Sequence, residues 1–312
     1  MLKSALAATA AVFSLVACVK QDDSPSDIVH ALPTAEQMSI KLPDNAARTA
    51  DANLLGQTAT WYIATRNVTR TVNGGAAVVL TVLHRIVQFP ATTISGNVYT
   101  WGPSSEALST TEYKLTVTAV GDGTYTYQLA GRLKNATSAP FEVVIDGTAD
   151  PRAGDQRGSG HFLMDFDAAR RISPIDNRDS RGSIDVRYDL AQRHLDLTVT
   201  TTDAADKPVA VDYAYNETAE GGGDMVFAIS LNAGGTAQLE SLTLRSRWLA
   251  TGAGRADARA SGGDLGDRQI TSSECWNTTF QRVYYTDPLG LADPEGVEAD
   301  CAFATADLPP AP

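Results

Sequence analysis

The feature that most constrains the fold is a long series of short segments in which apolar and polar residues alternate. Residues 112–120 (EYKLTVTAV) and 124–132 (TYTYQLAGR) both alternate. The Asp122-Gly123 step between them is typical of a β-hairpin turn, because glycine tolerates a positive φ. Further alternating segments occupy residues 141–149, 158–167, 182–190, 193–202, 208–216, 224–232, 237–249 and 254–262. Their connections are short, so neighbouring segments are expected to pair in antiparallel order.

These segments predict a mainly β protein of the α+β class. Its centre would be a large, curved antiparallel sheet or open barrel of about ten or more strands over residues 96–262. Residues 46–90 follow another pattern: apolar and threonine residues recur every third or fourth position on both sides of Asn73-Gly74-Gly75. This spacing predicts a pair of helices packed on the concave face of the sheet. The alternative is two strands joined by a turn at the glycines, because threonine and valine are frequent there.

The first residues of the chain have the composition of a secretory signal. Lys3 is followed by an uncharged run from Ser4 to Leu15, which is too short to span a bilayer well. The run ends in Leu15-Val16-Ala17-Cys18, which resembles the lipobox of bacterial lipoproteins. The alternative is an ordinary cleaved signal peptide followed by an incidental cysteine.

The lipobox resemblance implies a domain organisation and a location. Residues 1–17 would be a signal peptide, and Cys18 would carry the acyl chains that anchor the protein to a membrane. Val19 stands where an aspartate would favour the inner membrane, so the resemblance implies a bacterial cell envelope, and the outer membrane within it. Residues 18–45 are acidic and contain prolines, which predicts a solvated tether. Residues 46–312 are expected to form a single β-rich domain.

The two other cysteines, Cys275 and Cys301, predict a disulfide in an oxidising compartment. The disulfide would staple a C-terminal cap over residues 270–305 and contribute about 3 kcal/mol by the chain-entropy model. A zinc or redox pair is the alternative, but no Cys-x-x-Cys spacing and no nearby histidine support it. The formal net charge of −12 argues against nucleic acid as a partner and against a polybasic membrane contact.

We find no sequence motif for catalysis or for a cofactor. The four histidines are isolated from one another, and the chain contains neither a Gly-x-Ser-x-Gly elbow nor a glycine-rich phosphate loop. Asp165, Asp167, Asp176 and Asp179 lie among arginines, which favours a solvated loop of ion pairs over a calcium site. The sequence therefore predicts a protein that has no enzymatic activity, no catalytic residues, no metal site and no cofactor. A pair of carboxylates for glycoside hydrolysis stays open.

An N-terminal helical pair, a long antiparallel sheet and a lipid anchor together make the chain similar to the half-barrel periplasmic lipoprotein carriers. The resemblance implies that an apolar small molecule or lipid binds between the sheet and the helices. Its lining residues would be Trp61, Leu83, Ile86, Phe162, Met164 and Phe166, of which the last three share one face of a predicted strand. The alternative is a structural or protein-interaction lipoprotein, in which these six side chains form a filled core. An envelope hydrolase without a recognisable motif is the third hypothesis.

Overall fold

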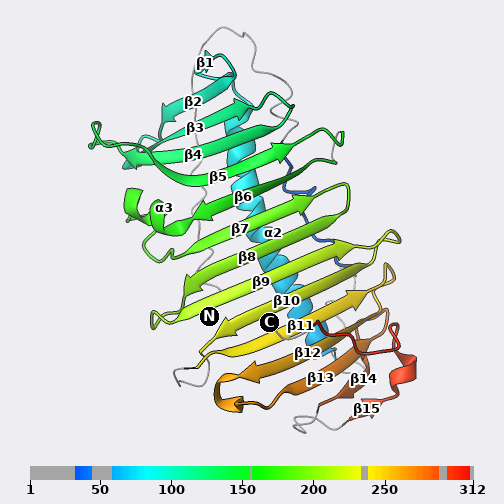
Figure 1. The fold of residues 1–312 in the computed structure, drawn as a ribbon. Helices are drawn as coiled ribbons and strands as arrows, with labels where there is room; N and C mark the ends of the chain where they lie inside the picture. Colours follow the sequence, from blue (N-terminus) through cyan, green and yellow to red (C-terminus); the bar gives the residue numbers. More distant parts are fainter. Residues whose placement is uncertain (1–31, 44–57, 155–156, 233–237, 288–293, 310–312) are drawn as a thin grey trace. The chain divides into compact units, whose positions relative to one another are not determined.

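The computed structural model describes residues 32–43, 58–154, 157–232, 238–287 and 294–309. The chain is mainly β, and its strands form an antiparallel sheet in the order β1 to β15, so that each strand neighbours the next one in the sequence (Figure 1). The predicted fold class, a large antiparallel sheet accompanied by helix, is confirmed. By its contacts the chain divides into two compact units. One unit comprises Met1–Ser39, Gly74–Gln192 and Val199–Thr201, and the other comprises Ile40–Asn73, Arg193–Thr198 and Thr202–Pro312.

The first unit contains seven strands in its described residues. They are β1 (Thr93–Ser95), β2 (Val98–Ser104), β3 (Thr111–Ala119), β4 (Tyr125–Leu133), β5 (Glu142–Asp150), β6 (Ser159–Asp165) and β7 (Ser183–Asp189). The hairpin predicted at Asp122-Gly123 joins β3 to β4, and Gly123 has a φ of +88°. In β3, Leu115 and Val117 are buried on one face of the strand, as the alternating pattern requires.

One segment of the first unit differs from the prediction. The strand expected over residues 158–167 ends at Asp165, and the short helix α3 follows it (Phe166–Ile172). The Asp165 carboxylate accepts the backbone N–H of Ala168 at 2.8 Å, which caps the helix N-terminus. Phe166 therefore does not share a strand face with Phe162 and Met164. A solvated loop of ion pairs was predicted here, and helix α3 occupies part of that segment. Arg170 and Asp167 form one such ion pair, at 2.8 Å.

The remaining strands belong to the second unit, except for Val199–Thr201 of β8, which belong to the first. They are β8 (His194–Thr202), β9 (Pro208–Glu217), β10 (Gly223–Leu231), β11 (Glu240–Trp248), β12 (Gly254–Gly262), β13 (Ile270–Trp276), β14 (Arg282–Thr286) and β15 (Glu295–Gly296). The short 3-10 helices η3 (Gly263–Leu265) and η4 (Glu298–Asp300) also belong to it. Pairing therefore continues beyond residue 262, where the sheet was predicted to end, because the predicted cap begins with two further strands.

The segment predicted as two helices forms the single helix α2, which runs from Thr60 to Val87 through Asn73-Gly74-Gly75. Glycine costs about 1 kcal/mol in a helix interior, and burial of the flanking turns offsets this cost. The Asn73 side chain does not end the helix, because it bonds to the backbone N–H and carbonyl of Ile40 at 2.8 and 3.0 Å. Among the described helices, none combines the length and the apolar character needed to cross a membrane.

The two halves of α2 belong to different units, and each half has a buried side. In the first unit Leu80 and Leu83 have no exposed surface. In the second unit Thr65 and Thr69 are buried, and their hydroxyls contact Ser246 on β11 and Met225 on β10. The stripe that predicted a helix therefore coincides only in part with its buried side. Thr65, Val79, Leu83 and Ile86 are buried, whereas Trp61, Val68, Val72 and Val82 are half-buried.

Candidate functional site

The six side chains predicted to line a ligand site are divided between the two units. Trp61 belongs to the second unit, where its indole Nε1 donates to Ser272 Oγ at 3.1 Å. The other five belong to the first unit: Leu83, Ile86 and Phe162 are buried, and Met164 and Phe166 are half-buried. A pocket of about 270 Å³ in the first unit has none of the six in its wall, which consists of Thr110, Leu133, Lys134, Asn135, Pro174 and Ile175.

A second group of side chains, on strand β12, is the better candidate for a functional site. The sequence of β12, GRADARASG, alternates charged residues with alanine. Ala256 and Ala258 are 0% and 3% exposed on one face of the strand. On the opposite face Arg255 and Asp257 are buried almost completely, although each carries a charge. Burial of charge is costly unless partners satisfy it, so the surroundings of this face need explanation.

Cross-strand pairing shows which residues share each face. Ser246, Ala256 and Glu274 form one row across β11, β12 and β13, and this row faces the first half of α2. Two rows face the other way: Arg247, Arg255 and Cys275, and then Arg245, Asp257 and Ser273. Arg259 follows on the same face of β12. We call Arg245, Arg247, Arg255 and Arg259, together with Asp257, the arginine face.

The C-terminal segment covers the arginine face (Figure 1). We call residues 301–309 the tail segment. It begins at Cys301, whose disulfide to Cys275 confirms the predicted pairing, with the two Cα atoms 5.5 Å apart. Three arginines then donate to tail carbonyl oxygens: Arg255 to Phe303 at 3.2 Å, Arg247 to Thr305 at 2.8 Å and Arg259 to Pro309 at 2.8 Å.

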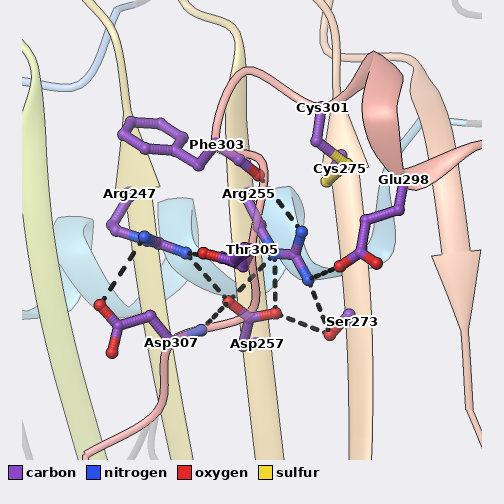
Figure 2. The surroundings of a disulfide bond; sticks show 10 residues. All are labelled: Arg247, Arg255, Asp257, Ser273, Cys275, Glu298, Cys301, Phe303, Thr305 and Asp307. Atoms are coloured by element: carbon purple, nitrogen blue, oxygen red, sulfur yellow. Dashed lines mark hydrogen bonds and ion pairs between the residues drawn. A yellow bond between two sulfur atoms is a disulfide. The ribbon is translucent and has the colours of Figure 1, made fainter.

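The bonded carbonyls belong to Phe303, Thr305 and Pro309, and the tail bends at residues 301–303 and at 305. The amide of Asp307, between them, donates to Asp257 Oδ2 at 3.2 Å. Figure 2 shows Arg247 and Arg255 directed at the tail, with the disulfide at one end. The arginine face therefore binds the backbone of the tail segment at several positions.

The buried charges of the face neutralise one another. Arg255 Nε lies 2.9 Å from Asp257 Oδ1, and its Nη2 lies 2.6 Å from Glu298 Oε1. Ser273 Oγ also donates to Asp257, at 2.6 Å. Burial lowers the pKa of Arg255, but the hydrogen bonds to Glu298 and Asp257 outweigh it, so the pKa of this guanidinium is raised overall. Arg255 therefore keeps its charge.

The rim of the face carries charges that water can reach. Arg245 Nη2 lies 2.7 Å from Asp224, and its Nη1 lies 2.7 Å from the tail residue Asp307. The hydrogen bond to Asp224 is the main cause of the raised pKa of Arg245. The Asp307 side chain is 49% exposed, so solvent screens its ion pairs.

The chemistry of this arrangement is that of recognition. Guanidinium groups are planar, permanently charged donors suited to carbonyl and carboxylate oxygens. Among the described residues, no group of three or more histidine, cysteine or acidic side chains is placed to hold a metal ion. From the sequence, β12 was predicted as a strand and not as a site. The available signal was three charged residues alternating with alanine in a strand flanked by others on both sides.

The chain has no match among protein-family models, curated proteins or solved structures. A function must therefore be argued from the geometry of the described residues.

Proposed function

We propose that this chain is a non-enzymatic interaction protein of a bacterial cell envelope, held to the membrane by acyl chains on Cys18. The lipobox-like Leu15-Val16-Ala17-Cys18 supports the anchor, although it lies outside the described residues. The Cys275–Cys301 disulfide agrees with an exported, oxidising location.

The observation that carries the interaction role is the arginine face. Its guanidinium groups bind the backbone of the tail segment mainly through carbonyl oxygens, so most of the contacts do not depend on side-chain identity. A protein surface that holds a peptide backbone in this way has the chemistry to hold another one. The core supports the same role, because Leu83 and Phe162 are buried as ordinary core residues.

Binding of an apolar small molecule or lipid stays a prediction. It requires a continuous apolar cavity of several hundred Å³, and the six side chains predicted to line it are buried, half-buried or, for Trp61, hydrogen-bonded to Ser272. Native mass spectrometry separates this alternative from the proposal. The full chain with Cys18→Ser would be purified from the periplasm without detergent and then offered oleate and phospholipid. We expect the mass of the protein alone, and a bound lipid would replace the proposal with the carrier hypothesis.

Site-specific photo-crosslinking in living cells tests the interaction role directly. A photoreactive residue at Ala304, an exposed position of the tail segment, should give a discrete adduct with another envelope protein. The same residue at Glu220, an exposed turn position between β9 and β10, is the matched control. Adducts at neither position would contradict an interaction protein.

The anchor has its own test. Wild-type protein should fractionate with membranes, and Cys18→Ser should be released from them. Continued membrane attachment of Cys18→Ser would reject the lipid anchor.

A further inference from the structure

We infer that the arginine face is a docking site for a non-helical segment of a partner protein that carries an aromatic residue and, four positions later, an acidic one. The tail segment would be the resident occupant of this site, which a partner displaces. The inference rests on the proposed interaction role and names the class of partner.

The backbone contacts define the path of the occupant's main chain. Arginines hold the carbonyls of Phe303, Thr305 and Pro309, and Asp257 accepts the amide of Asp307. Each of these contacts is made to a backbone atom, so another segment that follows the same path can replace the tail and keep them. The carboxylate and the guanidinium groups of the face therefore select conformation.

Two side-chain contacts add selectivity. The Arg247 guanidinium lies over the Phe303 ring, with 5.0 Å between Cζ and the ring centroid, a cation–π arrangement. The Asp307 carboxylate lies 2.7 Å from Arg245 and 3.8 Å from Arg247. An aromatic residue and an acid at this spacing are therefore the features that a partner segment must share with the tail.

The charge of the face favours an acidic occupant. Four arginines lie on it, while Asp224 and Asp257 are the acids that the neighbouring strands contribute to the same ion-pair cluster. This local excess of positive charge occurs in a chain whose formal net charge is −12. The tail supplies the balancing charge through Glu298, which precedes it, and Asp307. A competing acidic segment would supply it equally well.

The tail segment can leave the arginine face while the sheet stays folded. Cys301 holds one end of it covalently, and the ion pairs of the remainder depend on Asp307, whose side chain is half exposed. The face also retains an unused donor, because Arg247 Nε is buried without a hydrogen-bond partner among the described residues. An occupant with an acceptor at this point would bind more tightly than the tail does.

A fluorescence anisotropy experiment on the full chain tests the inference. The probe is the labelled peptide AFATADLP, which repeats residues 302–309 and is blocked at both ends. The chain is Asp307→Lys, in which the tail lysine is repelled by Arg245 and Arg247 and vacates the face. We expect Asp307→Lys to bind the peptide at least about tenfold more tightly than wild type, because the wild-type tail competes in cis.

Matched controls separate this mechanism from a general change of charge. Asp300→Lys makes the same change on η4, at an exposed position that precedes the tail, and should bind the peptide as weakly as wild type. Peptides with Asn in place of Asp, or Ala in place of Phe, should bind Asp307→Lys more weakly than the parent peptide does. The milder variant Asp307→Asn should fall between wild type and Asp307→Lys.

Equal affinity of wild type and Asp307→Lys, or no binding to either, would overturn the inference. The proposed interaction role would survive that result if photo-crosslinking at Ala304 still gave an adduct, since the partner would then contact the tail segment in place and would not displace it. A concentration-dependent dimer of the wild-type chain, abolished by Asp307→Lys, would identify a second copy as the occupant and overturn the assignment to a different partner.

Discussion

Glu274 Oε1 accepts the backbone N–H of Thr60 across 3.0 Å, although the two residues are 214 positions apart in the chain. The other carboxylate oxygen of Glu274 accepts the N–H of Trp61. Helix α2 has no acidic residue in its own first turn, so β13 supplies the negative charge that a helix N-terminus favours. Arg282 Nε lies 2.6 Å from the same carboxylate and neutralises it. The start of the helix is therefore fixed by the sheet.

Replacement of Glu274 by alanine should destabilise the protein strongly. The substitution removes the acceptor for two helix N–H groups and leaves Arg282, 7% exposed, without its buried counter-charge. Breaking a buried, hydrogen-bonded ion pair typically costs about 3–5 kcal/mol. Urea unfolding followed by circular dichroism would measure the loss.

Glu295→Ala is the matched control. Glu295 also approaches Arg282, at 3.5 Å, but its side chain is 47% exposed. Its removal should cost less than about 1 kcal/mol, as for other surface pairs. Similar losses for the two variants would show that burial of Glu274 is not the cause.

Loss of the disulfide should destabilise the chain and loosen the tail segment. The double variant Cys275→Ala/Cys301→Ala removes a cross-link between residues separated by 26 positions, worth about 3 kcal/mol by the chain-entropy model. The amide of Asp307, which donates to Asp257, should then exchange faster with deuterium. Hydrogen exchange with and without a reductant gives the comparison. The wild type should respond to reduction, and the double variant should not.

Gly74→Ala should stabilise helix α2. Gly74 lies in the helix interior, and a Cβ added there meets no atom within 4 Å. Alanine is favoured over glycine at such a position by about 1 kcal/mol. Thermal unfolding should therefore show a higher midpoint for Gly74→Ala. A lower midpoint would indicate that the helix breaks at this residue.

Gly160→Ala should have the opposite effect. A Cβ at this position of β6 would lie 2.3 Å from Tyr188 Oη and 2.4 Å from the Thr148 carbonyl oxygen. Tyr188 is buried and Thr148 belongs to the neighbouring strand, so relief of the clash requires the sheet to move. Overpacking of this kind costs about 1–3 kcal/mol. Comparison of the two glycine variants therefore separates the effect of helix propensity on stability from the effect of packing.

The sequence predicted the strands well because alternation is a local property. Each predicted segment between 112 and 262 contains a strand, and the Asp122-Gly123 hairpin lies where expected. β13 was not predicted, because its residues fall in the segment assigned to the disulfide-stapled cap. Helix α3 was missed because its seven residues are too few for a periodic signal, although Asp165 offered a capping residue.

Contacts between distant residues account for what the sequence did not predict. Asn73-Gly74-Gly75 favoured a turn by local preference, but Asn73 bonds to Ile40 and the helix continues. The arginine face depends on a tail that returns about 50 positions later to cover β12, and no local pattern encodes that return. Alternation showed that Arg255, Asp257 and Arg259 share a face. It could not show what covers that face.

The carboxyl of Asp150, at the end of β5, should titrate unusually low. Arg152 holds it with side-chain hydrogen bonds of 2.8 and 2.6 Å, and the backbone N–H of Arg152 donates at 3.0 Å. The side-chain hydrogen bonds are the main cause that lowers the pKa of Asp150 to about 2. A carboxyl whose pKa falls on folding adds stability above its ordinary pKa of 3.8, and this stability is lost as the pH falls toward 2. Since both side chains are substantially exposed, the effect on stability should be small.

The pKa is the sharper measurement, and NMR titration of the side-chain carboxyl carbons provides it. In Arg152→Ala the pKa of Asp150 should rise but stay below 3.8, because the backbone N–H of residue 152 still donates to the carboxylate. Asp203 is the internal control, since its lowered pKa results mainly from backbone N–H groups of Lys207 and Ala205. It should titrate identically in both proteins. An unchanged Asp150 pKa in Arg152→Ala would show that the guanidinium does not hold this carboxylate in solution.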